Sequence, residues 1–282
     1  MHIAIIMDGN RRWAKANGAS LLTAYRKGVS VLMDIAKYLA CRKDVHELTV
    51  YAYSLANINR SQMEKEVMST VFQESLKETR EIFVSHDIKV KMIGRKDSLS
   101  KDELNHIIEL ENATYNCQSL ILNVCFYYSG QWEIANAVLQ LFRNFFENQH
   151  LMESYDSYMH ECKKNYEQTN VINRNECSES VVPNAISNSL SNKHFSEFKN
   201  QNNCYPQFMN IDEIQKYLSE HLLRDVDLCI RPSGEQRLSN FLLWSNAYAE
   251  FMYSQTLWPD FSINELNIMI QEFYNRDRRF GI

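Results

Sequence analysis

Short apolar runs alternate with longer amphipathic stretches along most of the chain. The short runs are rich in β-branched and aromatic residues and predict strands at residues 3–7, 48–54, 88–93, 120–127 and 226–230. The longer stretches carry apolar residues at spacings of three and four without proline, and they predict helices at residues 12–38, 62–85, 101–116, 133–146 and 211–223. This alternation predicts an α/β fold in which helices flank a mostly parallel central sheet.

The alternating pattern is lost between about residues 144 and 203. This stretch is polar and rich in Asn, Ser, Glu and Lys, a composition typical of a surface insertion. A regulatory or partner-binding loop is the functional alternative. In either case we expect one domain, residues 1–282, that the insertion interrupts.

Composition excludes several classes of function. Hydrophobic residues make up 45% and charged residues 23% of the 282 residues, as in soluble globular proteins. A net charge of −5 argues against nucleic-acid binding through overall charge. The seven glycines are too widely spaced for a dinucleotide turn or a phosphate loop, and the seven cysteines show no zinc-type spacing. No apolar run is long enough to span a bilayer.

The first candidate site is the segment IIMDGNRRW at residues 5–13, where a buried strand ends and a helix is predicted to begin. Backbone amides at a helix start, with Arg11 and Arg12, favour a phosphate or diphosphate. Asp8 would repel that ligand unless Mg²⁺ bridged the two, so the segment indicates a metal-assisted anion site. The alternative is that Asp8 only caps the helix and the arginines are solvated.

A second basic segment, RPSGEQRLSNF at residues 231–241, also follows a predicted strand. Arg231, Arg237 and Ser239 have the chemistry of a second diphosphate clamp, with Glu235 orienting the arginines. The alternative is a surface ion-pair network around a turn. A third basic segment is RDRRFGI at residues 276–282. Its default interpretation is a frayed chain end.

Six ordered stretches together carry a specific resemblance. They are HIAIIMDGNRRWAK (2–15), LTVYAYSLANINR (48–60), LNVCFYYSGQWEIANAV (122–138), DLCIRPSGEQRLSNFLLW (227–244), AYAEF with LWPDF (247–261) and RRFG (278–281). Outside the insertion, the chain resembles the cis-prenyltransferases, the undecaprenyl and dehydrodolichyl diphosphate synthases. The doubled Arg11-Arg12 and the NVCF segment resemble the eukaryotic, dolichol-type branch more than the bacterial one.

The resemblance implies Mg²⁺-dependent condensation of isopentenyl diphosphate onto an allylic diphosphate, usually farnesyl diphosphate, to give a polyprenyl diphosphate of the dehydrodolichyl type. It also implies a homodimer in which each chain encloses an apolar tunnel, with Ala52 and the apolar face of residues 67–84 as candidate tunnel walls. Ordinary core packing fits those side chains equally well. By resemblance, the site residues are Asp8, Asn57 and Ser54 for catalysis; Gly9, Asn10, Arg11, Arg12, Trp13 and Arg60 for the allylic diphosphate; Arg231, Arg237, Ser239, Arg279 and Gly281 for isopentenyl diphosphate, with Glu235 orienting; and Asp8 and Glu250 for the metal.

Three departures from the family pattern affect this site. Leu21 and Tyr25 stand where the family commonly has an arginine and a histidine that contact the allylic diphosphate. The family segment S-x-E-N-W-x-R-P reads SLANINRS at residues 54–61, so its glutamate, tryptophan and proline are absent. The family segment N-Y-G-G-R reads YYSGQ at residues 127–131.

Two other functions compete with an active enzyme. One is a non-catalytic partner subunit of a heteromeric cis-prenyltransferase, and the other is a phosphate-binding regulator without lipid chemistry. The intact Asp8-Gly9-Asn10 segment and the set Arg231, Arg237 and Ser239 favour the enzyme. By resemblance we expect a cytoplasmic protein, associated peripherally with the cytosolic face of the endoplasmic reticulum. The sequence does not specify the product length or the role of the insertion.

Overall fold

A computed structural model describes residues 1–148, 211–218 and 225–278. By its contacts the chain divides into one unit of Met1–Asn136 with Leu218–Ile282 and a second unit of Ala137–Tyr217. The second unit holds most of α6 (Gly130–Asn148) and most of α10 (Ile211–Leu218), and Asn144 donates to the Tyr217 hydroxyl across them. The predicted insertion lies largely outside the described residues, and the single domain stays a prediction.

The first unit is built on a six-stranded sheet in the order β3-β4-β2-β1-β5-β6, and every neighbouring pair is parallel. The sheet is therefore of the predicted α/β type. Its strands are β1 (His2–Ile6), β2 (Glu47–Ser54), β3 (Ile88–Ile93), β4 (Leu120–Tyr128), β5 (Leu228–Arg231) and β6 (Glu250–Tyr253). The strand β6 has only four residues and was not predicted, because so short a run carries almost no periodic signal.

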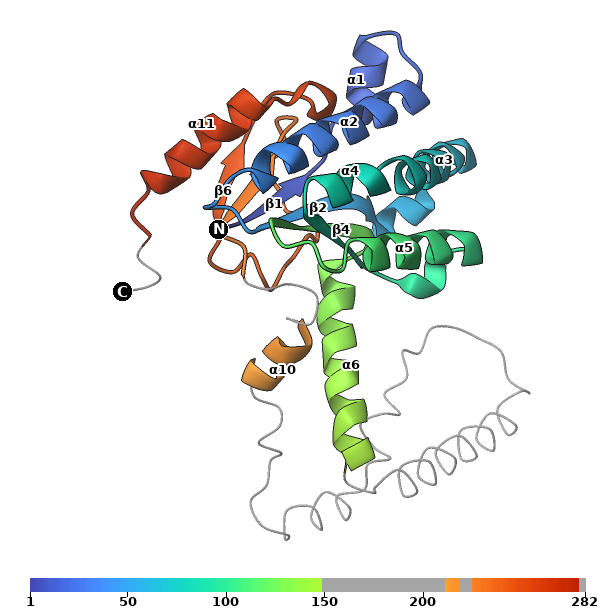
Figure 1. Ribbon diagram of the computed structural model, residues 1–282, viewed down its shortest axis with the longest axis vertical. Coiled ribbons are helices and arrows are strands. Elements are labelled where there is room, and N and C mark those ends of the chain that lie inside the picture. Colours follow the sequence, from blue (N-terminus) through green and yellow to red (C-terminus); the bar gives the residue numbers. More distant parts are fainter. Residues whose placement is uncertain (149–210, 219–224, 279–282) are drawn as a thin grey trace, which may run out of the picture. The chain divides into compact units, whose positions relative to one another are not determined.

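Helices cover one face of this sheet (Figure 1). They are α2 (Leu21–Ala40), α3 (Gln62–Glu78), α4 (Arg80–Ser85), α5 (Lys101–Ala113) and α11 (Ile263–Tyr274). Alternate strand residues such as Ile5, Val50 and Leu122 point into this layer and form the main core with the apolar faces of the helices. The opposite face packs against Phe241 and Leu242 of an irregular segment.

Two predicted helices are each divided in the structure. The first is split into α1 (Asn10–Ala16) and α2, because Gly18 takes a left-handed conformation and the Ser20 side chain then accepts from Thr23 N to cap α2. The second is split into α3 and α4 at Thr79, whose hydroxyl donates to the Ser75 carbonyl. The helix α11 was missed, although its buried residues Leu266, Met269, Ile270 and Phe273 have helical spacing.

Candidate functional site

The predicted site residues meet at the carboxyl ends of three neighbouring strands. Asp8 follows β1, Ser54 ends β2 and Arg231 ends β5, and these strands lie side by side in the order β2-β1-β5. Open α/β sheets bind ligands at this edge. A cleft there is lined by Asp8, Gly9, Asn10, Arg11, Arg12, Ser54, Asn57, Arg60, Arg231, Glu235, Arg237 and Ser239, all of which belong to the predicted site.

Asp8 is the carboxylate at the centre of the cleft. Its Oδ2 accepts from Arg231 Nη2 at 2.8 Å and lies 3.5 Å from Arg12 Nη2. Partial burial alone would raise the pKa of Asp8, but the hydrogen bond and charge of Arg231, with Arg12, outweigh it and hold the pKa below its ordinary value. Asp8 is therefore ionised at neutral pH, with 30% of its side chain exposed to the cleft.

Arg231 connects Asp8 to the second basic segment. Its side chain is only 5% exposed, and its Nη1 donates to Ser239 Oγ at 2.8 Å and to the Arg237 carbonyl. Glu235 pairs with Arg237 and lies 3.5 Å from Arg12 Nη1. Both basic segments therefore face one cleft, and Glu235 lies beside an arginine of each, while its orienting role stays a prediction.

The short 3₁₀ turn Leu55–Asn59 (η1) forms the wall beyond β2. The Asn57 Oδ1 accepts from Ser54 N at 3.1 Å, and the Asn57 carbonyl accepts from the Tyr53 hydroxyl at 3.1 Å. These bonds hold Ser54 and Asn57 together at the cleft, and their catalytic roles stay predictions.

A buried carboxylate that the sequence analysis missed, Glu64, lies beside this wall. Its Oε1 accepts from the Tyr25 hydroxyl at 2.9 Å and from Arg60 Nη1 at 2.7 Å, and its Oε2 lies 3.8 Å from Arg11 Nη1. Burial, with the charge of Glu64 and despite that of Arg60, raises the pKa of Tyr25 to about 12. Tyr25 therefore stays a neutral donor to Glu64, and together they fix Arg60.

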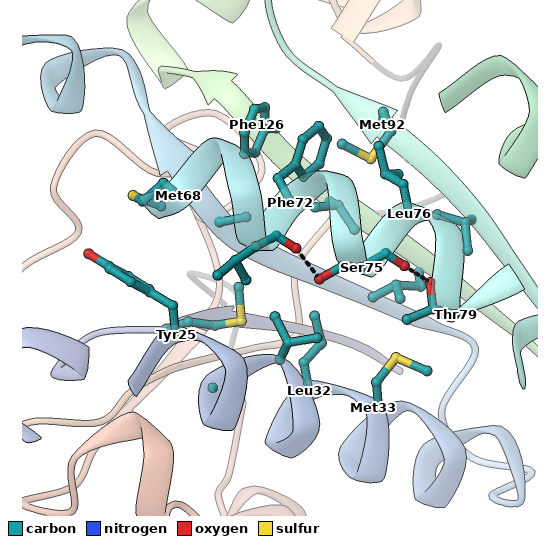
Figure 2. Close-up of a pocket in the computed structure, with 18 of the residues that line it drawn as sticks. Tyr25, Leu32, Met33, Met68, Phe72, Ser75, Leu76, Thr79, Met92 and Phe126 are labelled. Carbon is teal, nitrogen blue, oxygen red and sulfur yellow. Dashed lines mark hydrogen bonds between the residues drawn. The ribbon is translucent and has the colours of Figure 1, made fainter. Parts of the chain in front are cut away.

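An apolar pocket adjoins the polar cleft. Met7, Asn10, Tyr25, Ala52 and Met68 line both cavities, so they form a shared neck. Beyond the neck the pocket runs between α2, α3 and the sheet, and Leu32, Met33, Phe72, Leu76, Met92 and Phe126 are among its walls (Figure 2).

Two hydroxyl groups face this pocket without making it polar. Ser75 and Thr79 each donate to the carbonyl four residues earlier in the chain, at 2.6 Å in both cases (Figure 2). Because these protons are used within the chain's own backbone, the hydroxyls have none left for a ligand. The pocket is therefore suited to a hydrocarbon chain.

Two predicted site residues that the structure describes, Trp13 and Glu250, do not line the cleft. Trp13 is buried, with its Nε1 donating to Asp260 Oδ2 at 2.8 Å and Lys27 Nζ 4.4 Å from its ring centroid. Glu250 begins β6, so it lies at the amino ends of the strands, opposite the cleft, and pairs with Arg276 at 2.8 Å. Arg279 and Gly281 are outside the described residues.

Lys15, Tyr25 and Tyr51 line the cleft although they were not among the predicted site residues. Spacing alone offered a signal for two of the missed side chains. Lys15 follows Arg11 by four residues on α1, which places the two on one side of that helix. Glu64, in the first turn of α3, follows Arg60 by four and pairs with it. In the sequence, Tyr25 stood out only as a departure at a position where the family commonly has a diphosphate-contacting residue, and nothing comparable indicated Tyr51.

The cleft has the chemistry to hold Mg²⁺ together with a phosphate. The described residues contain no group of three or more His, Cys, Asp or Glu that could enclose a metal ion. Mg²⁺, however, is commonly bound by one or two carboxylates together with substrate phosphates. Asp8, ionised and partly exposed among cationic side chains, fits that role, whereas Glu250 of the same chain lies elsewhere.

Comparison with known proteins identifies relatives along nearly the whole chain. The sequence model of a family described as "Putative undecaprenyl diphosphate synthase" matches residues 6–281. An isoprenyl transferase of Clostridium acetobutylicum is 33% identical over 281 residues, covering 99% of this chain and 89% of that protein. A ditrans,polycis-undecaprenyl-diphosphate synthase ((2E,6E)-farnesyl-diphosphate specific) of Buchnera aphidicola is 30% identical over 280 residues, covering 99% and 90%.

A solved structure supports the fold independently. The lavandulyl diphosphate synthase from Lavandula x intermedia, in complex with dimethylallyl diphosphate, superposes with a TM-score of 0.73 at 23% identity. The match covers 100% of this chain and 98% of that one. At this identity the likeness establishes the architecture of the sheet and its helices.

These relatives correct one expectation from the sequence. The two sequence relatives are bacterial enzymes, so assignment to the eukaryotic, dolichol-type branch is not supported, and neither is the endoplasmic reticulum as its location. That assignment rested on Arg11-Arg12 and the NVCF segment, whereas the bacterial likeness extends over the whole chain. Within the described residues, no helix is both long and apolar enough to cross a bilayer.

Proposed function

Because the chain belongs to the undecaprenyl diphosphate synthase family of cis-prenyltransferases, we propose that it condenses isopentenyl diphosphate onto an allylic diphosphate such as farnesyl diphosphate. The product is a polyprenyl diphosphate. A cation-lined cleft that opens through a shared neck into an apolar pocket is the observation that carries this proposal. A substrate with a diphosphate head and a hydrocarbon tail has the same two parts.

Each of the two basic segments binds one of the two substrate diphosphates. Gly9, Asn10, Arg11 and Arg12, with Arg60, take the allylic diphosphate, whose hydrocarbon chain passes the neck. Arg231, Arg237 and Ser239 take isopentenyl diphosphate. The arginines supply fixed positive charge and paired N–H donors, which suit phosphate oxygens.

Condensation breaks the bond between allylic C1 and its diphosphate and joins C1 to the terminal alkene carbon of isopentenyl diphosphate. A proton then passes from the carbon next to the oxygen-bearing CH₂ to an oxygen of the released diphosphate, and Asn57 with Ser54 assists its removal. Because negative charge develops on the departing diphosphate, cations already held in place lower the barrier. When bound beside Asp8, Mg²⁺ would supply further charge for that diphosphate.

Growth of the product is driven by burial of hydrocarbon. Each CH₂ that enters the apolar pocket contributes about 0.8 kcal/mol, so the growing chain is favoured inside until the space is filled. We further propose that the chain works as a homodimer in which Arg279 and Gly281 reach the partner's isopentenyl site, and that the apolar product leaves at a membrane surface.

The test is incubation of the purified chain with farnesyl diphosphate, labelled isopentenyl diphosphate and Mg²⁺, followed by chromatography of the extracted lipid. We expect a labelled polyprenyl product that is lost in Asp8→Ala. Asp97→Ala, which removes an exposed carboxylate paired with Arg95, should keep the activity. A wild-type chain that is folded but inactive would contradict the proposal and favour a non-catalytic partner subunit.

A further inference from the structure

The segment that presents Ser239 to the cleft has an unusual backbone. Three of its residues have positive φ angles, at +51° for Ser239, +65° for Asn240 and +43° for Leu242. Residues other than glycine adopt this conformation at a cost, so the surrounding structure must hold them there.

The Asn240 carboxamide provides that hold. Its Oδ1 accepts from Gln131 N at 3.0 Å, and its Nδ2 donates to Ser129 Oγ at 2.8 Å and to Gln131 Oε1 at 3.3 Å. The Asn240 carbonyl also accepts from Gly130 N at 2.7 Å. Asn240 therefore binds the segment to the start of α6 through both its side chain and its backbone.

These contacts account for one departure of the sequence from the family pattern. Ser129 and Gln131 belong to the YYSGQ stretch that differs from N-Y-G-G-R. In this chain both side chains receive hydrogen bonds from Asn240. The departure thus supplies two of the acceptors that hold the segment in place.

From Asn240 the connection to the cleft runs through the neighbouring residue Ser239 and its hydrogen bond with Arg231. The Ser239 hydroxyl, next to Asn240 in the chain, accepts from Arg231 Nη1, and Arg231 in turn donates to Asp8. We propose that Asn240 is a positioning residue for the isopentenyl diphosphate clamp, acting through Ser239 and Arg231 without touching substrate. This inference rests on the proposed function.

The variant Asn240→Gly isolates the side-chain contacts, because glycine adopts a φ of +65° without strain. We expect the KM for isopentenyl diphosphate to rise about tenfold, the scale of one lost hydrogen bond of ~1.4 kcal/mol. The KM for farnesyl diphosphate and kcat should change by less than about twofold, because the residues proposed to bind the allylic diphosphate are not held by Asn240.

Asn246→Ala is the matched control in the same irregular segment. Asn246 is buried and donates from Nδ2 to the Phe241 carbonyl at 3.0 Å, on the core side of the segment. We expect this variant to lose stability and to keep the wild-type KM for isopentenyl diphosphate. Equal increases in both KM values in Asn240→Gly would mean a general loss of structure and would overturn the inference.

Calorimetric titration with isopentenyl diphosphate alone, without starter, separates this inference from the proposed function. We expect wild type to bind and Asn240→Gly to bind about tenfold more weakly. Wild type that binds and turns over, with Asn240→Gly indistinguishable from it, overturns the inference only. Wild type that neither binds nor turns over overturns the proposed function and the inference together.

Discussion

Asp8 and Arg231 show how single side chains join the two basic segments. They are separated by 223 positions, yet they form a hydrogen-bonded ion pair in which the arginine is almost fully buried. The carboxylate keeps the arginine's charge balanced before a diphosphate arrives, and a buried, oriented guanidinium is suited to binding the oxygens of isopentenyl diphosphate.

Glu133 is a buried carboxyl group outside this pairing. The Tyr128 hydroxyl donates to its Oε2 at 2.5 Å, and its Oε1 is buried without a hydrogen-bond partner among the described residues. Burial raises the pKa of Glu133 to about 7, although the bond from Tyr128 lowers it in part. In the folded chain this group is therefore largely protonated in mildly acidic solution.

This pKa predicts a pH dependence of stability. The unfolded chain releases the proton near pH 4.5 and the folded chain near pH 7, so the contribution of Glu133 to stability falls as pH rises through that window and is constant above it. Glu133→Gln is neutral throughout and should lack the fall, which we expect to be on the order of 3 kcal/mol. Urea unfolding over a pH series checks this, and parallel curves for wild type and variant would contradict it.

At the scale of elements, the end of β3 depends on a close backbone approach. A Cβ at Gly94 would lie 1.8 Å from the carbonyl oxygen of Phe126 in β4, and the φ of Gly94 is +146°. Gly94→Ala should therefore destabilise the chain by more than ~3 kcal/mol.

Gly18 is the matched control for this substitution. It has a φ of +59°, and a Cβ added to it would have no other atom within 4 Å among the described residues. Gly18→Ala should therefore cost only ~1 kcal/mol of backbone strain. Thermal unfolding compares the stability of the two variants. Equal losses of stability would show that the close contact with β4 does not cause the destabilisation in Gly94→Ala.

The helix α3 forms a wall of the apolar pocket and exposes its other side to solvent. Ser75 is a small residue facing the pocket, so Ser75→Phe should fill part of it and shorten the polyprenyl product. Thr70→Phe adds an equal ring on the exposed side of the same helix and should leave product length unchanged. Chromatography of the products measures their chain length in both variants. A polyprenyl product of unaltered length from Ser75→Phe would show that the product does not occupy this pocket.

At the scale of the whole molecule, charge is distributed unevenly. The chain has a net charge of −5, but the cleft is lined by Arg11, Arg12, Lys15, Arg60, Arg231 and Arg237 against only the carboxylates of Asp8 and Glu235 among the described residues. A cationic cleft in an anionic protein attracts diphosphates to one place and repels them elsewhere.

This distribution predicts a salt effect on binding. Raising KCl from about 50 to about 300 mM shortens the Debye length to below ~10 Å and should raise the KM for both diphosphates about threefold or more. The change in kcat should be smaller, because bound substrates are shielded from solvent ions. Steady-state kinetics at several salt concentrations test this. In Lys15→Gln the dependence should be weaker, and KM values that do not respond to salt would contradict the electrostatic account.

The sequence alone determined the local features of this protein. Apolar runs marked five of the six strands, and Asp8 and Arg231 could be placed at strand ends because each follows such a run directly. The parallel α/β arrangement followed from the alternation of strands and helices. These features depend on residues that are close together in the chain, so a local pattern of apolar and polar residues is enough to predict them.

Only the tertiary structure decided which of these residues meet. The strand order β2-β1-β5 joins Asp8 to Arg231, folding of α2 against α3 brings Tyr25 to Glu64, and the irregular segment places Asn240 on the start of α6. The same order puts Glu250 at the opposite ends of the strands, away from Asp8. Such contacts result from packing the whole core, in which every element competes for the same faces, so no local stretch of sequence specifies them.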